Sequence, residues 1–169
     1  MALYETIPYN VIRKDGPIEI REYNDYLLAS TKTQLNNRMD SGFNNVFNYI
    51  SGQNTAKEKI SMTTPVVSYQ EEDNLVTGFY VPSKYNKESV PKPASTNVFI
   101  NEQESSLYGV IRFRGAWTDH NFSKQEETLR TYLTNNNYTI TSQRLIFRYT
   151  PPFVPGVLRR NEIAFKISK

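Results

Sequence analysis

The sequence predicts an α+β protein: a distorted eight-stranded antiparallel β-barrel or sheet, made from two βαββ pseudo-repeats and flanked by two α-helices. Three observations support this class. Several short segments alternate apolar and polar residues with a period of two, which is typical of strands with one buried face. Two longer segments carry apolar residues at helical spacing. The order strand, strand, helix, strand, strand occurs in each half of the 169 residues.

The first half follows a short amphipathic lead-in and a turn at Asp15-Gly16-Pro17. Asp-Gly supplies a positive φ and proline fixes the exit from the turn. The helix is indicated by apolar residues that recur on one face, and Gly52 can close it. The expected elements are a strand at 18–23, its hairpin partner at 26–34, a helix from Met39, and strands at 66–70 and 75–81.

The second half repeats this plan. Phe122, Leu129 and Leu133 have helical spacing, and Ser123 with Glu126 has the arrangement of a capping box. Three asparagines, 135–137, end the helix because asparagine tolerates the left-handed conformation. The expected strands are a hairpin at 98–102 and 107–113, and the pair 142–149 and 162–167.

A weak internal match accompanies the repeated order. Leu27-Leu28 aligns with Val110-Ile111, and at the same spacing Tyr49-Ile50-Ser51 aligns with Tyr132-Leu133-Thr134. The pseudo-repeats therefore cover about 18–81 and 97–167, and a ligand is expected in a cleft between such halves.

Composition excludes several classes of protein. Apolar residues make up 38% and charged residues 22%, which is ordinary for a globular chain. The net charge is +3, but lysine and arginine are scattered, so we expect no nucleic-acid partner. The chain has no cysteine, which removes disulfides, thiolate haem ligation and Cys zinc sites. No segment approaches the ~20 apolar residues of a membrane span, so the expectation is a cytoplasmic protein.

The stretch from Tyr149 to Glu162 joins an apolar loop to charged residues. Three prolines stiffen the loop, and Arg159, Arg160 and Glu162 follow its apolar tip. Arginine binds carboxylates bidentately, so this junction suits an apolar ligand with an anionic edge. The alternative is that these three residues form a structural ion-pair cluster that holds the loop to the sheet.

The chain resembles the SOUL haem-binding family and its relatives among the GyrI-like small-molecule binding domains. The matching segments occur in order over nearly the whole chain. They are Asp15 to Tyr23, Gly42-Phe43 with Tyr49-Ile50 and Gly52, Lys59 to Val66, Val81 to Tyr85, Ile111 to Trp117, Tyr149 to Phe153, and Arg159 to Glu162.

This resemblance implies one SOUL-type domain over residues 1–169, a distorted eight-stranded barrel with two helices. Animal members bind haem and related tetrapyrroles without one shared axial ligand. GyrI-like relatives place a carboxylate from a late strand among aromatic side chains, an arrangement that Glu162 resembles. The resemblance also leaves open a role as a sensor or an enzyme that acts on a small molecule through Glu162.

The residues disfavour tight ligation of haem iron. The single histidine, His120, lies at the polar start of the second helix, and Met39 and Met62 are more often core residues than ligands. A porphyrin can instead lie on apolar walls while its propionates meet arginines. The prediction is therefore weak, non-obligate binding of haem or another tetrapyrrole, or of a similar hydrophobic small molecule.

The predicted ligand-binding residues combine apolar walls with the charged end of the loop. No catalytic residue or metal ligand is predicted, and no recognised catalytic constellation favours an enzyme. A protein-interaction module that uses the loop from Phe153 to Leu158 is a further alternative. The predicted site consists of Met39, Phe43, Met62, Val66, Phe153, Leu158, Arg159, Arg160 and Glu162.

Overall fold

The computed structural model describes residues 4–35, 39–150 and 154–169, without the side chains of residues 39–41. These residues form strands, two α-helices and a 3-10 turn. In chain order they are β1 (Glu5–Thr6), β2 (Tyr9–Asp15), β3 (Ile18–Tyr23), β4 (Tyr26–Gln34), α1 (Met39–Ile50), β5 (Thr63–Thr64), β6 (Val66–Glu71), β7 (Asn74–Tyr80), β8 (Phe99–Gln103), β9 (Ser106–Arg114), α2 (Asp119–Asn135), β10 (Thr139–Ile140), β11 (Leu145–Arg148), η1 (Gly156–Leu158) and β12 (Arg160–Ser168).

The chain divides into two compact units, each of which is described by itself. Unit 1 comprises Met1–Ile7 and Asp25–Glu104, and unit 2 comprises Pro8–Asn24 and Ser105–Lys169. Each unit contains one α-helix packed on antiparallel strands, and unit 1 also contains the short parallel pair β1-β5. That the whole chain acts as a single domain stays a prediction.

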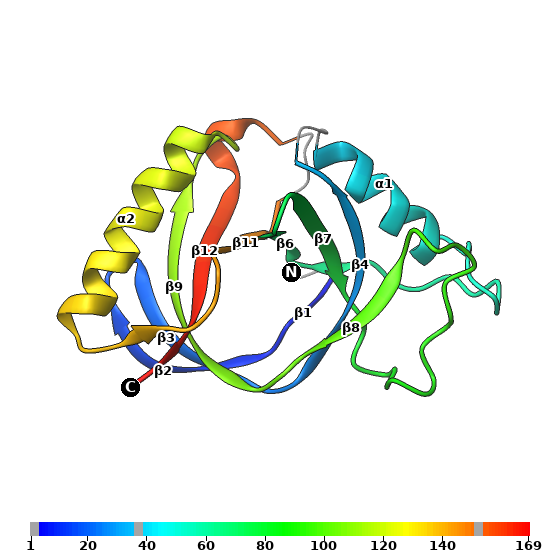
Figure 1. Ribbon diagram of the computed structural model, residues 1–169, viewed down its shortest axis with the longest axis horizontal. Helices are drawn as coiled ribbons and strands as arrows, with labels where there is room; N and C mark the ends of the chain where they lie inside the picture. The colour runs from blue at the N-terminus through cyan, green and yellow to red at the C-terminus, as the bar shows by residue number, and fades with distance from the viewer. Residues whose placement is uncertain (1–3, 36–38, 151–153) are drawn as a thin grey trace. The chain divides into compact units, whose positions relative to one another are not determined.

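In unit 1, the strands follow the order β6-β7-β4-β8, and all neighbours are antiparallel. Helix α1 contacts β4 and β7, and Figure 1 shows it lying across these strands. Val46 and Ile50 of α1 are buried against Leu27, Ala29 and Val81 of the sheet and its continuation. Successive strand residues point to opposite faces, so Leu28 lies on the face away from α1.

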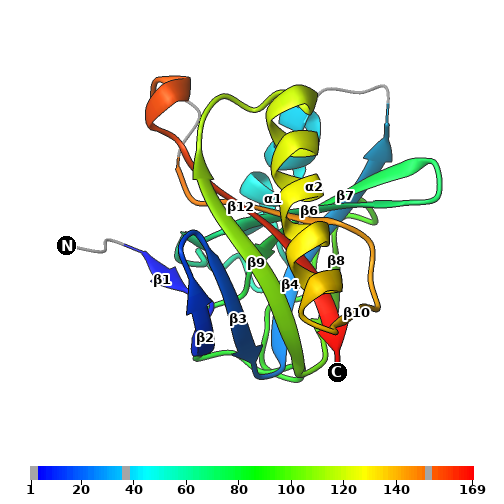
Figure 2. The same cartoon turned by 90° about the vertical axis from the view of Figure 1, so that its left-hand side faces the viewer.

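In unit 2, the order is β2-β3-β9-β12-β11, with β10 also paired to β12. Helix α2 contacts β9 and β12, as Figure 2 shows. Its buried residues Leu129 and Leu133 pack against Ile111 and Ile163. Gly109 permits this close packing, because a Cβ there would come within 2.6 Å of Cδ2 of Leu133.

The predicted fold class is confirmed, with largely antiparallel sheets and two helices. The bounds predicted for β3 and β4 and the start of α1 agree with the structure. The lead-in segment contains β2, which pairs with β3 through the Asp15-Gly16 turn, where Gly16 has a φ of +59°. Neither helix of the described residues has the length and apolar character needed to cross a membrane.

The two predicted hairpins at 18–34 and 98–113 are wrong. Strand β3 pairs with β2 and β9, and β4 pairs with β7 and β8. Similarly, β9 pairs with β3 and β12. A strand has only two edges, and in β3, β4 and β9 both are occupied by other strands. The chain instead passes from one unit to the other at Asn24-Asp25 and at Glu104-Ser105.

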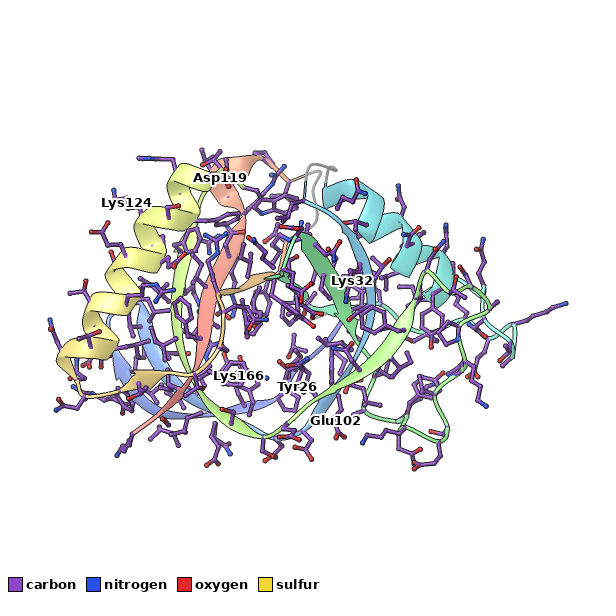
Figure 3. The ribbon with its side chains drawn as sticks, viewed as in Figure 1. Tyr26, Lys32, Glu102, Asp119, Lys124 and Lys166 are labelled. Atoms are coloured by element: carbon purple, nitrogen blue, oxygen red, sulfur yellow. The ribbon has the colours of Figure 1, made fainter. Side chains whose placement is uncertain are left out.

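Helix α2 begins earlier than the capping-box pattern predicted. Its N-cap is Thr118, whose side chain accepts a hydrogen bond from the backbone N–H of Asn121. Asp119 therefore lies on the first turn, and Lys124 follows one turn later (Figure 3). Glu126 forms ion pairs with Arg130 and Arg144 instead of capping the helix. The predicted end is confirmed, since Asn136 is the C-cap and Asn137 has a φ of 65°.

Candidate ligand-binding site

A buried ion pair lies on the face of the unit 2 sheet that is turned away from α2. Glu162 of β12 and Arg21 of β3 both have 0% exposure. Nη1 of Arg21 donates to Oε1 of Glu162, and Nη2 donates to Oε2, each over 2.7 Å. This bidentate arrangement spans the intervening strand β9, because β9 pairs with both β3 and β12.

Two further donors of Arg21 are also used. Nε donates to Oε1 of Glu19 over 2.8 Å, and Nη1 donates to the hydroxyl of Tyr23 over 2.9 Å. Burying a charge costs several kcal/mol unless it is paired and hydrogen bonded. Two carboxylates and one phenol meet this requirement for Arg21.

Three guanidinium groups converge on one oxygen of Glu162. Oε2 lies 2.7 Å from Nη2 of Arg21, 3.1 Å from Nη2 of Arg160 and 3.5 Å from Nε of Arg112. The side chains of Arg112 and Arg160 are 44% and 32% exposed. One buried carboxylate therefore orients an inner arginine and two arginines that reach solvent.

The surrounding charges keep Glu162 ionised. Burial would raise the pKa of this carboxyl, but hydrogen bonds and charges from Arg21 and Arg160 outweigh burial and hold the pKa below its ordinary value. A carboxylate in this state is a poor general acid. Burial, and then the charge of Glu162, raise the pKa of Tyr149 well above its ordinary value, so Tyr149 stays neutral.

Aromatic rings cover the guanidinium groups. The Cζ atom of Arg21 lies 4.0 Å from the ring centroid of Tyr9, and that of Arg160 lies 4.0 Å from the ring centroid of Tyr149. Tyr23 and Tyr108 continue the aromatic layer, with ring centroids 4.4 Å apart. Cation–π contacts of this kind stabilise arginine in a fixed orientation.

The adjacent arginines of the predicted clamp have different surroundings. Arg160 lies against Tyr149 and Glu162, whereas Cζ of Arg159 lies 4.2 Å from the ring centroid of Trp117. Nε of Arg159 also donates to the carbonyl of Val154 over 2.9 Å. The structure thus brings Arg160 and Glu162 together, as the ion-pair alternative expected, and places Arg159 against another ring.

The predicted apolar residues fall into three groups. Phe43, Met62 and Val66 belong to the unit 1 core, where Phe43 and Met62 are partly buried. Leu158 is 55% exposed in unit 2, beside Val157 at 76%. The side chain of Met39 and all of Phe153 lie outside the described residues.

Sequence reasoning missed Arg21 as the partner of Glu162. The pattern of β3 placed Glu19 and Arg21 on the polar face of a strand, which normally means solvent exposure. The available signal was that Arg21 and Glu162 each lie in a segment that resembles the family. Neither residue's burial nor their pairing across β9 could be read from those segments.

A small polar cavity lies in unit 1, between α1 and the segment before β8. Its volume is about 90 Å³. Pockets for drug-sized ligands are roughly 300–1,000 Å³, so this cavity does not fit a tetrapyrrole. It is lined by Asn45, Asn48, Tyr49, Gln53, Pro93, Ser95, Asn97 and Val98.

Residues for metal ligation are not assembled in the described part of the chain. His120 is exposed on the first turn of α2, as the sequence indicated. The described residues contain no group of three or more His, Cys, Asp or Glu side chains that can hold a metal ion. The donor set that is gathered consists of arginines, which bind anions and not metals.

Comparisons with known proteins identify relatives over nearly the full chain. The sequence model of the SOUL heme-binding protein family matches residues 4–166. Heme-binding protein 2 of Mus musculus is 26% identical over 174 residues, which cover 96% of this chain and 83% of that protein. Heme-binding protein 2 of Homo sapiens is 30% identical over 128 residues, or 70% of this chain and 62% of that protein.

Solved structures share the fold at low sequence identity. The C-terminal domain of EcmrR has a TM-score of 0.68 and 11% identity, covering 95% of this chain and 98% of that one. SAV2435 bound to tetraphenylphosphonium has a TM-score of 0.52 and 12% identity, with coverage of 89% and 93%. These similarities concern the fold and carry no function by themselves.

Proposed function

Because this chain belongs to the SOUL heme-binding protein family, we propose that it binds a hydrophobic small molecule of the tetrapyrrole class, haem included, without strong axial ligation of iron. The names of its relatives in Mus musculus and Homo sapiens support this ligand class. A cytoplasmic location and the lack of a nucleic-acid partner stay predictions.

The observation that carries the proposal is the apolar end of η1 beside cationic side chains. Val157 and Leu158 are 76% and 55% exposed, and Arg159 and Arg160 follow directly. A tetrapyrrole presents a flat apolar ring with carboxylates at one edge. The exposed aliphatic side chains can contact such a ring, while a guanidinium group binds the carboxylate.

The described residues fit this mode better than iron ligation. His120 is exposed on α2, and Met62 packs against the unit 1 core. Arginine and aliphatic side chains need nothing from the metal, so metal-free porphyrin should bind about as well as haem. When bound, haem would supply a redox-active iron that this set of residues leaves without a strong protein ligand.

An absorbance titration of the purified protein with haem tests the proposal. We expect saturable binding at micromolar haem, equal affinity in His120→Ala, and weaker binding when Arg159→Ala is combined with Arg160→Ala. No saturable change in the wild type, or unchanged affinity in the double variant, would reject the proposed mode.

The remaining predicted wall residues stay part of the proposal. Phe43 and Val66 lie in the unit 1 core. Val66 is 9% exposed, and the ring centroids of Phe43 and Phe79 lie 5.2 Å apart. Truncating either residue should lower stability through lost packing. Affinity must therefore be measured on variants whose folding has been checked, and Met62→Leu is the mildest of these changes.

The alternative of a cation sensor or enzyme acting through Glu162 is less well supported. A structure with this fold holds tetraphenylphosphonium. In this chain Glu162 already faces three guanidinium groups, so a cation would meet repulsion there. A titration with tetraphenylphosphonium should show no saturable binding, and binding that Glu162→Gln abolishes would favour the alternative.

A protein-docking role for the loop is the second candidate function. The same exposure of Val157 and Leu158 favours it, because exposed aliphatic side chains are frequent at interaction sites. A partner that binds the wild type and Lys124→Glu, but not Leu158→Asp, would support this role. Equal binding by both variants would remove it.

A further inference from the structure

Strands β9 and β12 place like charges directly opposite each other. Arg114 pairs in register with Arg160, and Arg112 pairs with Glu162. Directly paired residues of antiparallel strands have side chains on the same face. Like charges in such positions destabilise a sheet unless an opposite charge lies nearby.

The charges on this face do not balance. Arg21, Arg112 and Arg160 meet Glu162, and Glu19 adds a second carboxylate at Arg21. Arg114 donates to a neutral acceptor, the carbonyl of Leu158, over 3.0 Å. Four guanidinium groups therefore face two carboxylates, and the excess positive charge lies on the arginines that reach solvent.

Arg160 has unused hydrogen-bonding capacity. Its Nη2 donates to Glu162, but its Nε atom is buried and has no hydrogen-bond partner among the described residues. Buried guanidinium donors are normally paired, and Arg160 lies opposite Arg114 in the ladder, so an acceptor bound beside these two residues could serve this atom.

We propose that Arg112, Arg114 and Arg160 form a subsite for one anionic group of the ligand, a carboxylate or a phosphate. The buried carboxylate of Glu162 serves as a fixed counter-ion that orients two of these arginines, Arg112 and Arg160. The inference rests on the proposed function only for the identity of the ligand, whose acid edge this subsite would receive. In this subsite the anionic group is held by arginines from two paired strands, β9 and β12, and not by the adjacent residues Arg159 and Arg160 alone.

The subsite makes a prediction about ligand chemistry. Charge-assisted hydrogen bonds from arginine require an ionised acceptor. Haem dimethyl ester keeps the ring and the iron but lacks both carboxylates. We expect the ester to bind at least roughly tenfold more weakly than haem, which corresponds to the loss of one hydrogen bond to a charged group.

Matched double variants test the assignment to these residues. Arg112→Gln with Arg114→Gln should weaken haem binding at least roughly tenfold and leave ester binding unchanged. The control is Arg130→Gln with Arg144→Gln, which removes the same charge from two residues that pair with Glu126. The control should bind haem like the wild type. Equal losses in both double variants, or equal affinity for haem and its ester, would overturn the inference.

Failure of the proposed function can be told apart from failure of the subsite. If the wild type binds no haem, the tetrapyrrole proposal fails, and inorganic pyrophosphate then probes the subsite by calorimetry. Saturable binding that is lost in Arg112→Gln with Arg114→Gln and kept in the control supports an anion site. No saturable binding, or binding that both double variants retain, contradicts it.

Discussion

In each unit, the strand before the helix pairs with a strand after it, but the units differ on the sheet face turned away from the helix. Leu27 in unit 1 and Ile111 in unit 2 both pack with the helix of their unit. On the far face, Leu28 lies opposite Tyr80 in unit 1, and Arg112 lies opposite Glu162 in unit 2. Unit 1 thus buries an uncharged pair on this face, and unit 2 has an ion pair there.

This difference suggests why the charges are present. Leu28 and Tyr80 are 0% and 5% exposed, so neutral residues can fill the far face of such a ladder. Replacing a buried ion pair by packed apolar residues is often neutral or stabilising. The charged face of unit 2 is therefore not required by the ladder, which is our reason for assigning it to ligand binding.

The largest effect is expected from removing the partner of Glu162. Arg21→Met leaves a buried carboxylate without its bidentate donor and should cost about 3–5 kcal/mol of unfolding free energy. Combining Arg21→Met with Glu162→Leu should recover a large part of this loss, since unit 1 folds with neutral residues. Urea denaturation measures both values. A loss below about 1 kcal/mol in the single variant would mean that the pair contributes little.

Acid should remove part of the same stabilisation. The pKa of Glu162 is lower in the folded protein than its ordinary value of about 4.3. Its contribution is therefore fully present above that value and is lost as the pH falls through the folded pKa. Glu162→Gln should show a flatter dependence of unfolding free energy on pH below about 4.3 than the wild type. Parallel curves for the two proteins would contradict the shift.

The units also differ in how helix and sheet approach each other. In unit 2 the glycine lies in the strand, and Gly109→Ala forces contact with Leu133, at a cost of about 1–3 kcal/mol. In unit 1 the glycine lies in α1, where a Cβ on Gly42 would lie 3.0 Å from Oγ1 of Thr77. Gly42→Ala should cost less, because alanine gains up to about 1 kcal/mol in helix propensity. Thermal unfolding of both variants tests the order, and a larger loss for Gly42→Ala would reverse it.

The smallest effect is expected at the neutral pair. The hydroxyl of Tyr80 donates to Glu5 over a long 3.4 Å, so Tyr80→Phe should cost less than about 1 kcal/mol. The hydroxyl of Tyr23 accepts from buried Arg21 over 2.9 Å, and Tyr23→Phe should cost about 1–3 kcal/mol. Equal losses in urea denaturation would show that the two faces do not differ in this respect.

Sequence periodicity predicted the elements better than their partners. Strands β3 and β4 follow from alternation within six to nine residues, a local property. Their pairing depends on contacts with strands that are distant in the sequence, such as Ile18 with Ile111 and Leu28 with Tyr80, and a short turn gave the wrong partner. Alternation also cannot show that Arg21, on a polar face, is buried.

The alignment of the two halves was correct for the helices and wrong for the strands. Ile50 and Leu133 were aligned, and each packs in the core of its unit. Leu27 was aligned with Val110, but Leu27 packs with the helix of its unit, whereas Val110 precedes the helix-facing Ile111 and therefore lies on the opposite face. A slip of one residue in a strand moves the side chain to the opposite face, so the alignment placed a helix-facing residue opposite one that faces away.

The central claim is that the charged face of unit 2, and not the neutral face of unit 1, binds the ligand. The most direct test is a titration of 15N-labelled protein with metal-free protoporphyrin, followed by amide chemical shifts. We predict the largest changes at Arg112, Arg114 and Arg160 on β9 and β12. Changes confined to β4 and β7 around Leu28 and Tyr80 would contradict the claim.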